Sequence, residues 1–211
     1  MARLTRAERR RQTRARLLAA AGEVFARRGF HAATVDEVAD AAGYTKGAVY
    51  SNFATKDELF LALLDERIAA QLEQTQALYA VESSEELLAA MRGRTEREFA
   101  AARDFGLLMV EFSLHAMRNP AAQAGLAERY RQLRGRLGEL ITRRYARRHA
   151  SPPMPAEHLA ALALATDAGL FLQYAAEPGA LPWELHADAM LRLLDPPDRP
   201  PGGAGPASPE P

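Results

Sequence analysis

Two short helix-like patterns stand almost back to back between Thr34 and Phe53, and this pairing limits the fold more than any other part of the sequence. Thr34 and Glu37 have the spacing of a capping box, which marks the start of the first pattern. Gly43 ends that pattern after about two turns, and the second pattern covers Thr45 to Phe53. Because isolated helices of this length are marginal in water, both must pack against longer neighbours.

Longer helical patterns flank the short pair on both sides. The first covers residues 11–28 and stops at Gly29, and the other begins at a second capping box, Thr55 with Glu58, and continues to about Leu78. Ala, Leu, Arg and Glu dominate the chain, and alternating strand-like runs are absent. We therefore predict an all-α fold, in which an N-terminal three-helix domain is joined by a fourth helix to a larger C-terminal helical domain.

The second half of the chain has the pattern of longer helices. Proline stands at or near several of their starts, where a missing N–H group costs little. From Pro196 onward the sequence is rich in Pro and Gly and nearly free of apolar side chains, which predicts disorder. The predicted helices cover residues 84–103, 105–118, 120–148, 156–176 and 182–194, and the predicted domains cover residues 11–71, 72–195 and 196–211.

Charge is distributed unevenly along a chain whose formal net charge is zero. Residues 1–31 contain nine arginines but only two acidic residues, Glu8 and Glu23. Such asymmetry is typical of a segment with a polyanionic partner, and it is equally typical of a solvated, disordered arm. The charge pattern alone leaves both interpretations open.

Several function classes find no support in the sequence. The absence of cysteine excludes disulfides and thiolate metal sites. The five histidines are scattered without metal-ligand spacing, and neither a nucleophile elbow nor a phosphate loop is present. No signal-peptide pattern occurs, and no uninterrupted run approaches the roughly 20 apolar residues of a membrane span. We predict a cytoplasmic protein that is not an enzyme, with no catalytic residue, metal site, cofactor or membrane association.

The second short helix is expected to turn its polar side outward, because Val49 and Phe53 pack inward. A short helix presented after a tight turn has the helix-turn-helix geometry, whose second helix enters the major groove of DNA. The helix starts at Thr34 and Thr55 offer free N–H groups to phosphate, and Lys56 adds a cation. The predicted DNA-facing residues are Thr34, Tyr44, Thr45, Lys46, Gly47, Tyr50, Ser51, Asn52 and Lys56.

An ordinary corner between two helices would leave a similar pattern. In that interpretation Gly47 only relieves a tight helix crossing, and Tyr44 and Tyr50 are half-buried packing residues. The four-helix context and the neighbouring arginines favour the DNA-binding interpretation.

Residues 11–71 resemble the DNA-binding domain of the tetracycline-repressor (TetR) family of transcriptional regulators. The layout is similar as well, with a small N-terminal helical domain followed by a larger one. Ser51 and Asn52 stand where many members of the family carry a larger aromatic residue and a histidine. The residues that carry the resemblance are Phe25, Gly29, Phe30, Thr34, Ala41, Ala42, Gly43, Thr45, Lys46, Gly47, Tyr50, Phe53, Lys56 and Leu59.

The resemblance implies a homodimer that binds a palindromic operator in double-stranded DNA, usually as a repressor. It also implies a small apolar or amphipathic effector, bound in the C-terminal domain, that releases the dimer from its operator. The predicted residues from Tyr44 to Asn52 fall on the family's DNA-facing helix, and Thr34 and Lys56 fall at its phosphate-contacting helix starts. The alternative is a helical adaptor or ligand-binding protein of the same fold without specific DNA binding.

Aromatic and methionine side chains in the C-terminal half are the candidates for the effector pocket that the resemblance implies. Such residues suit an adaptable apolar pocket, but a stripe of them at helical spacing is more often ordinary core. The helix at 157–178 is rich in small residues, such as Ala161, Ala165 and Gly169, and with the last helix it resembles the family's dimer-forming pair. The predicted effector-binding residues are Phe105, Met109, Phe112, His115, Phe171 and Tyr174.

Overall fold

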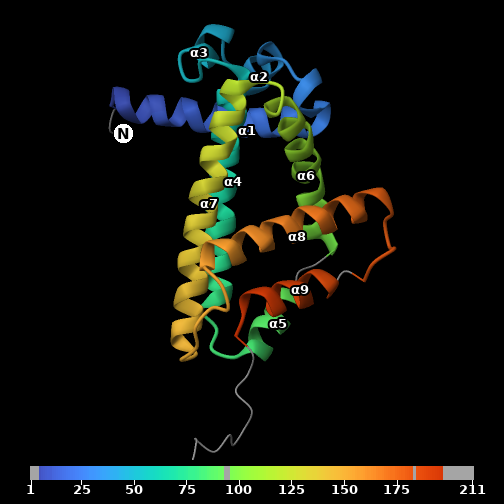
Figure 1. Cartoon of the computed structure of the whole chain (residues 1–211). Coiled ribbons are helices and arrows are strands. Elements are labelled where there is room, and N and C mark those ends of the chain that lie inside the picture. The colour runs from blue at the N-terminus through green and yellow to red at the C-terminus, as the bar shows by residue number, and fades with distance from the viewer. Residues whose placement is uncertain (1–4, 93–95, 183, 197–211) are drawn as a thin grey trace, which may run out of the picture.

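In the computed structural model, a small head stands above a larger body (Figure 1). The head consists of α1 to α3 and the start of α4, and the body consists of the rest of α4 and the later helices. The structure describes residues 5–92, 96–182 and 184–196, and within these ranges it contains nine α-helices and no strand. The predicted all-α fold is therefore confirmed. Residues 197–211, which make up most of the predicted tail, lie outside the described ranges.

The head follows the predicted order of long, short, short and long helices. Thr34 and Thr55 cap α2 and α4 as their spacing predicts, since their Oγ1 atoms accept hydrogen bonds from the N–H groups of Glu37 at 3.2 Å and Glu58 at 3.0 Å. Gly43 ends α2 with a φ of 70°, a left-handed conformation that glycine adopts without a steric penalty. The four helices are α1 (Arg6–Ala32), α2 (Val35–Ala42), α3 (Lys46–Tyr50) and α4 (Lys56–Tyr79).

α1 is longer at both ends than the predicted range of 11–28. Its start is fixed by a capping box that the sequence analysis missed: Thr5 Oγ1 accepts from the N–H of Glu8 at 3.2 Å, and Glu8 Oε2 accepts from the N–H of Thr5 at 2.6 Å. Gly29 interrupts the helix as predicted, with φ 75° and ψ 166°, but helical residues resume and continue to Ala32.

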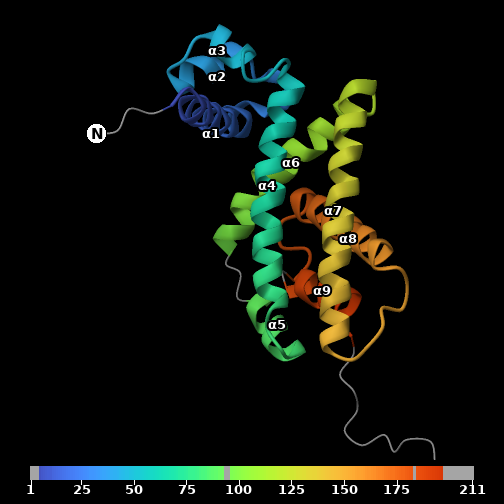
Figure 2. The same cartoon turned by 90° about the vertical axis from the view of Figure 1, so that its left-hand side faces the viewer.

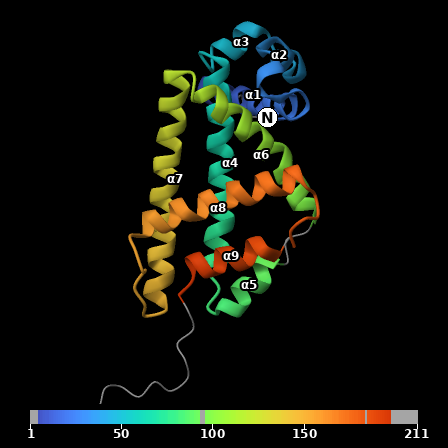
Figure 3. The same ribbon diagram turned by 45° about the vertical axis from the view of Figure 1, so that its right-hand side comes forward.

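The body adds five helices to the lower part of α4, of which α5 and α7 pack against α4 directly. α4 and α7 stand side by side and run in the same direction, α8 crosses α7, and α9 lies against α8 and α5 (Figures 2 and 3). α6 runs back up to the head and packs against α1. The five helices are α5 (Ser84–Arg92), α6 (Glu96–Ala116), α7 (Pro120–Arg147), α8 (Ala156–Ala176) and α9 (Glu184–Leu194).

One predicted helix break in the body is wrong. The sequence predicts helices over 84–103 and 105–118, whereas α5 ends at Arg92 and α6 starts at Glu96 and passes without a break through the predicted gap. A single charged residue at that gap does not stop a helix whose apolar face continues to pack. The sequence does hold the better signal, because Gly93 follows the basic Arg92 as at many helix ends.

Two hydrophobic clusters hold the chain together. The upper cluster joins α1 to α4 with α6 and the start of α7, and its central rings are Phe25, Phe30, Phe60 and Phe112. Phe60 and Phe112 stack with ring centroids 4.3 Å apart, and Phe30 meets Phe112 edge-on at 5.0 Å. The lower cluster joins the end of α4 to α5, α7, α8 and α9. α4 enters both clusters, so the predicted domain boundary at residues 71 and 72 falls inside one continuous helix.

A buried ion pair connects the lower end of the body. The side chains of Arg144 in α7 and Asp195, directly after α9, are 1% and 2% exposed, and Arg144 Nε donates to Asp195 Oδ1 at 2.6 Å. Arg144 also donates to the carbonyl of Val81, and the hydroxyl of Ser84 donates to the other carboxylate oxygen of Asp195. The pair therefore joins α7, the end of α9 and the segment between α4 and α5.

α8 combines an apolar composition with high exposure. Among the described residues it is the one helix with the length and composition of a membrane span, yet only 17% of that apolar window is buried. Leu159 and Ala163 face inward, while Leu162 and Leu172 are 44% and 51% exposed. Asp167 interrupts the apolar sequence, so α8 is not the uninterrupted run that a membrane span typically shows.

Candidate nucleic-acid interface

α3 is a five-residue helix that local hydrogen bonds and one buried side chain hold in place. Thr45 is its N-cap, and Thr45 Oγ1 accepts from the N–H of Ala48 at 3.2 Å. In the turn before it, the N–H of Tyr44 donates to the carbonyl of Ala39 at 2.9 Å. Val49 is 1% exposed and fixes the inner side of α3 to the head. The short helix is therefore positioned from within the head and presents its other side to solvent.

The outer side of α3 is open. Tyr50 is 47% exposed, and Thr45, Lys46 and Gly47 are exposed as well. A Cβ added to Gly47 would meet only Thr45 Oγ1, at 3.8 Å, within a 4 Å radius. Gly47 therefore does not sit in a tight helix crossing, and Tyr50 is exposed, whereas Tyr44 is half-buried as the interpretation as an ordinary corner expects.

Tyr44 and Lys46 connect the outer surface to neighbouring helices. Tyr44 is half-buried, and hydrogen bonding to Thr13 of α1, with a smaller effect from Arg16, lowers the pKa of its phenol. Lys46 Nζ lies 2.9 Å from Asp36 Oδ2 of α2, and this hydrogen bond raises the pKa of the ammonium. Because both partners of this ion pair are more than half exposed, Lys46 can exchange Asp36 for another anion.

The chain turns directly after Tyr50, so the helix predicted over Thr45 to Phe53 is too long at its end. Ser51 Oγ and Asn52 Nδ2 both donate to the carbonyl of Ala48 at 2.9 Å. Side-chain donors of this kind compete with the hydrogen bonds of a continuing helix. Ser51 remains exposed at the end of α3, and Asn52 is half-buried.

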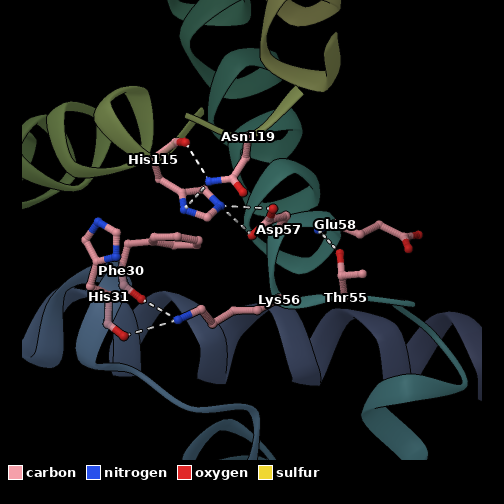
Figure 4. Close-up of polar contacts among 8 residues, drawn as sticks. All are labelled: Phe30, His31, Thr55, Lys56, Asp57, Glu58, His115 and Asn119. Atoms are coloured by element: carbon pink, nitrogen blue, oxygen red, sulfur yellow. Dashed lines mark hydrogen bonds and ion pairs between the residues drawn. The ribbon is translucent and has the colours of Figure 1, made fainter. Parts of the chain in front are cut away.

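The ammonium of Lys56 points into the head (Figure 4). Nζ donates to the carbonyls of Phe30 at 2.9 Å, His31 at 3.2 Å and Ala33 at 3.1 Å. An ammonium has three N–H donors, so these carbonyls at the end of α1 can use all of them. Burial lowers the pKa of Lys56. The structure gives Lys56 an internal bonding role, and its contact with phosphate stays a prediction.

α6 reaches the head through Glu111, a polar residue in an otherwise apolar stretch of sequence that could orient a ligand or face solvent. The carboxylate of Glu111 accepts from the N–H of Phe30 at 2.7 Å and from that of His31 at 3.4 Å. It lies against Gly29, where a Cβ would come within 2.7 Å of a carboxylate oxygen. The positive φ of Gly29 favours glycine, and any other residue there would also displace the Glu111 carboxylate. No local sequence pattern indicates these contacts, because Phe30 and His31 precede Glu111 by 81 and 80 residues.

His115 forms a second contact between α6 and the head (Figure 4). Its Nε2 lies 3.0 Å from Asp57 Oδ2 in the first turn of α4, and Asn119 Nδ2 donates to the His115 carbonyl at 2.8 Å. The ring of His115 also lies 5.8 Å from that of His31. His115, a predicted effector-binding residue, is therefore placed where α6 meets the start of α4.

The other predicted effector-binding residues differ in how far they are buried. Phe112 is fully buried in the upper cluster, and Phe105 and Met109 pack against that cluster. Phe171 lies against Gly106, and the hydroxyl of Tyr174 donates to the carbonyl of Pro182 at 2.8 Å. One surface hollow lies between α4 and α7, and a second lies between α7 and the start of α8. None of the six predicted residues lines either hollow. The effector-binding role of the six residues stays a prediction.

A short helix held outward after a tight turn, in an all-helical chain with an arginine-rich first helix, defines a helix-turn-helix DNA-binding regulator. The chain belongs to the TetR family of transcriptional regulators. Residues 17–63 match the family profile described as "Bacterial regulatory proteins, tetR family", and residues 99–195 match the profile described as "BetI-type transcriptional repressor, C-terminal". These proteins are regulators and not enzymes, as the sequence predicts.

Individual relatives agree with this assignment. The "HTH-type transcriptional activator FasR" of Mycolicibacterium smegmatis is 52% identical over 66 residues, which are 31% of this chain and 28% of FasR. A solved transcriptional regulator from Rhodococcus sp. Rha1 is 29% identical, with a TM-score of 0.63 over 86% of this chain and 95% of that one. FadR from Bacillus subtilis, solved with stearoyl-CoA, is 16% identical, with a TM-score of 0.58 over 85% and 96% of the two chains. The last likeness shows the fold alone.

Proposed function

We propose that this chain is a homodimeric cytoplasmic repressor that binds a palindromic operator and leaves it when a small apolar or amphipathic ligand binds the C-terminal domain. The observation that carries the DNA-binding part is the open outer side of α3, where Tyr50 is 47% exposed and the Lys46 side chain 55% exposed. In this proposal α3 enters the major groove, which is about 12 Å wide and admits one helix.

The residues around α3 have distinct roles in the proposed complex. Thr45 and Tyr50 are the main contacts to bases or phosphates, because both are exposed on the outer side of α3. Gly47 lets the backbone approach the DNA closely. Thr34 stands at the start of α2, whose free N–H groups suit a phosphate. Lys56 holds the end of α1 against the start of α4 and thereby positions these parts.

A second copy of the chain is the proposed cover for the open side of α8. Leu162 and Leu172 are 44% and 51% exposed on it, and Ala165 between them is exposed as well. A Cβ added to Gly169 would meet nothing within 4 Å, so a partner helix has room to approach. A twofold axis beside α8 and α9 would pair this apolar stripe with itself. The two heads could then read half-sites about 34–36 Å apart, or a multiple of that distance.

The route from effector to DNA is proposed to run through α6. Glu111 and His115 join this helix to Phe30 of α1 and Asp57 of α4. A ligand that displaces α6 must break these contacts or move the head with them. The likeness in fold to FadR, which was solved with stearoyl-CoA, supports an amphipathic ligand with a long apolar part.

Substitutions on α3 test the DNA-binding part. The probe is a duplex that the wild-type protein selects from a genomic library. Tyr50→Ala and Lys46→Glu are each expected to abolish specific binding in a fluorescence anisotropy titration, while gel filtration still shows the dimer. Tyr130→Ala and Arg136→Glu, which change exposed residues of α7, are the matched controls. Wild-type affinity in both α3 variants would show that another element reads the DNA.

A reporter gene behind the selected operator tests the direction of regulation. A repressor lowers reporter transcription, and its removal raises it. The opposite result would make the protein an activator, as FasR is named. If the wild-type protein prefers no duplex over random DNA, the alternative of a helical adaptor without specific DNA binding takes the place of this proposal.

A further inference from the structure

The first part of α1, before Thr13, extends beyond the rest of the head as a single helix (Figure 1). α1 starts at Arg6, but its first buried residue is Leu17. The family profile also starts at residue 17, so the match does not include this extension. The capping box of Thr5 and Glu8 fixes the outer end of the helix. A disordered arm was one of the two interpretations that the charge pattern allowed for this arginine-rich segment. From Arg6 onward the segment is instead a helix with a defined direction.

Three arginines form a row along one side of this extension. Arg6, Arg10 and Arg14 are spaced four residues apart, which places them on one face of a helix. With a rise of about 1.5 Å per residue, the row is about 12 Å long. Like charges at this spacing destabilise an isolated helix. The row therefore costs the free helix a little stability, which negative charge placed beside it would offset.

The inner end of the row is attached directly to the DNA-reading part of the head. The guanidinium of Arg14 lies over the ring of Phe53, 4.3 Å from its centroid, and Arg14 Nη1 is 3.5 Å from the carbonyl of Asn52. Asn52 and Phe53 directly follow α3 and its turn. The row thus starts next to the end of α3 and leads outward from it.

The outer two arginines have no acidic partner in the described part of the chain. Arg6 and Arg10 take part in no ion pair there, and both are exposed. The one acidic residue of the extension, Glu8, has its carboxylate on the N–H of Thr5. Two guanidinium groups without an acidic partner, on a fixed helix, complement the charge of a phosphate backbone, to which arginine binds in a forked geometry.

We infer that Arg6 and Arg10 bind phosphates outside the half-site that α3 reads, with Arg14 fixing the direction of the row. This inference rests on the proposed function, and it adds a second DNA contact to each subunit. Phosphate contacts position a protein without reading sequence. The extension therefore raises the affinity for every duplex that is long enough to reach it and leaves the preference for the operator unchanged.

The test compares the salt dependence of binding in full-length variants. Arg6→Gln combined with Arg10→Gln removes both charges and keeps good helix formers. Arg136→Gln with Arg143→Gln, two exposed arginines on α7, is the matched control for total charge. Binding to the selected duplex is measured from 50 to 200 mM salt. Each lost phosphate contact lowers the slope of log K against log salt by about 0.9, so a dimer losing four contacts changes by up to about 3.6.

Duplex length gives a second measurement. The wild-type protein should bind a duplex trimmed to the two half-sites more weakly than the longer duplex, because it loses its phosphate contacts outside the half-sites. The Arg6/Arg10 variant should bind both duplexes equally well, because it lacks these contacts. The ratio of operator to random-sequence affinity should stay the same in both. Equal slopes in the wild type and the variant, or an equal loss in the α7 control, would overturn the inference. Failure of the wild type to prefer any duplex would instead contradict the proposed function.

Discussion

The head and the body both have apolar helix faces, but the head buries them within the chain and the body leaves part of one exposed. In the head, Phe25, Phe30 and Phe60 are at most 1% exposed and pack on rings from other helices of the same chain. In the body, α8 is apolar along its length, yet Leu162 and Leu172 remain largely exposed. The comparison indicates that the head is complete within one chain, whereas the body presents a surface that is suited to a partner.

The head should lose the most stability when one of its rings is removed. Phe60→Ala deletes a fully buried ring that packs on Phe25, Phe30 and Phe112. We expect the free energy of unfolding to fall by about 3–5 kcal/mol in denaturant titrations followed by circular dichroism. Leu114→Ala, at a residue that is 51% exposed, should change it by less than about 0.5 kcal/mol. A similar small loss in both variants would show that the aromatic cluster is not the main stabilising element.

The lower part of the body is held together by the buried ion pair of Arg144 and Asp195. Asp195→Ala leaves the guanidinium buried without its carboxylate, which typically costs about 3 kcal/mol or more. The unfolding midpoint in denaturant is the measurement. Asp188→Ala is the control, because it breaks a more exposed pair on α9, in which Asp188 Oδ1 lies 2.6 Å from Arg92 and the Asp188 side chain is 39% exposed. An unchanged midpoint would show that the buried pair does not stabilise the body, in contrast to the aromatic rings in the head.

The exposed stripe of α8 should matter for assembly rather than for the fold of one chain. Leu162→Arg with Leu172→Arg places two charges on the proposed interface, and we expect a monomer in analytical ultracentrifugation at micromolar concentration. Loss of two-headed binding should weaken operator affinity by about 100-fold or more. Leu114→Arg changes a leucine of equal 51% exposure on α6 and should leave the dimer intact. A dimer in the double variant would place the interface elsewhere.

The contact between body and head should respond to Glu111. Glu111→Ala leaves the N–H of Phe30 without its acceptor, which we expect to lower the free energy of unfolding by about 1–3 kcal/mol. Glu111→Gln should cost less, because the amide oxygen still accepts a hydrogen bond. Hydrogen exchange at the amides of Phe30 and His31 should be faster in both variants, and Glu23→Ala on the exposed side of α1 is the control. Unchanged exchange at Phe30 would contradict the contact.

The smallest effect is expected from the hydroxyl of Tyr50. Tyr50→Phe keeps the ring and removes one hydrogen-bonding group from an exposed position, so the stability of the head should not change. Affinity for the selected operator should fall by about fivefold, which corresponds to a single hydrogen bond of about 1 kcal/mol. No loss of affinity would indicate that the ring, and not the hydroxyl, contacts the DNA.

The sequence predicts best what is decided locally. Thr34 with Glu37 forms the predicted capping box, and Gly43 stops a helix by its own conformation, so these boundaries agree with the structure. The second predicted box is only half formed, because Thr55 caps α4 through the N–H of Glu58 while the Glu58 carboxylate accepts from the N–H of Ala54. The capping box at Thr5 is equally local, and it was missed because the surrounding arginines resemble a disordered arm.

Contacts between distant segments could not be predicted in the same way. The carbonyls that bind Lys56 and the N–H groups that bind Glu111 belong to an interruption of α1 that only the folded chain brings near them. No periodicity or spacing marks such partners. For the same reason, the sequence identified His115 as a polar residue in an apolar helix but could not place it beside Asp57.

α4 is one 24-residue helix that begins beside α3 and ends in the lower cluster. At about 1.5 Å per residue it is about 36 Å long, and it behaves as a lever between the two ends of the molecule. A tilt of about 5° at its lower end would move its upper end by about 3 Å, close to the 3.4 Å step between neighbouring base pairs. In the proposed dimer, a rotation of this size would therefore shift each head along the DNA by about one step of the duplex.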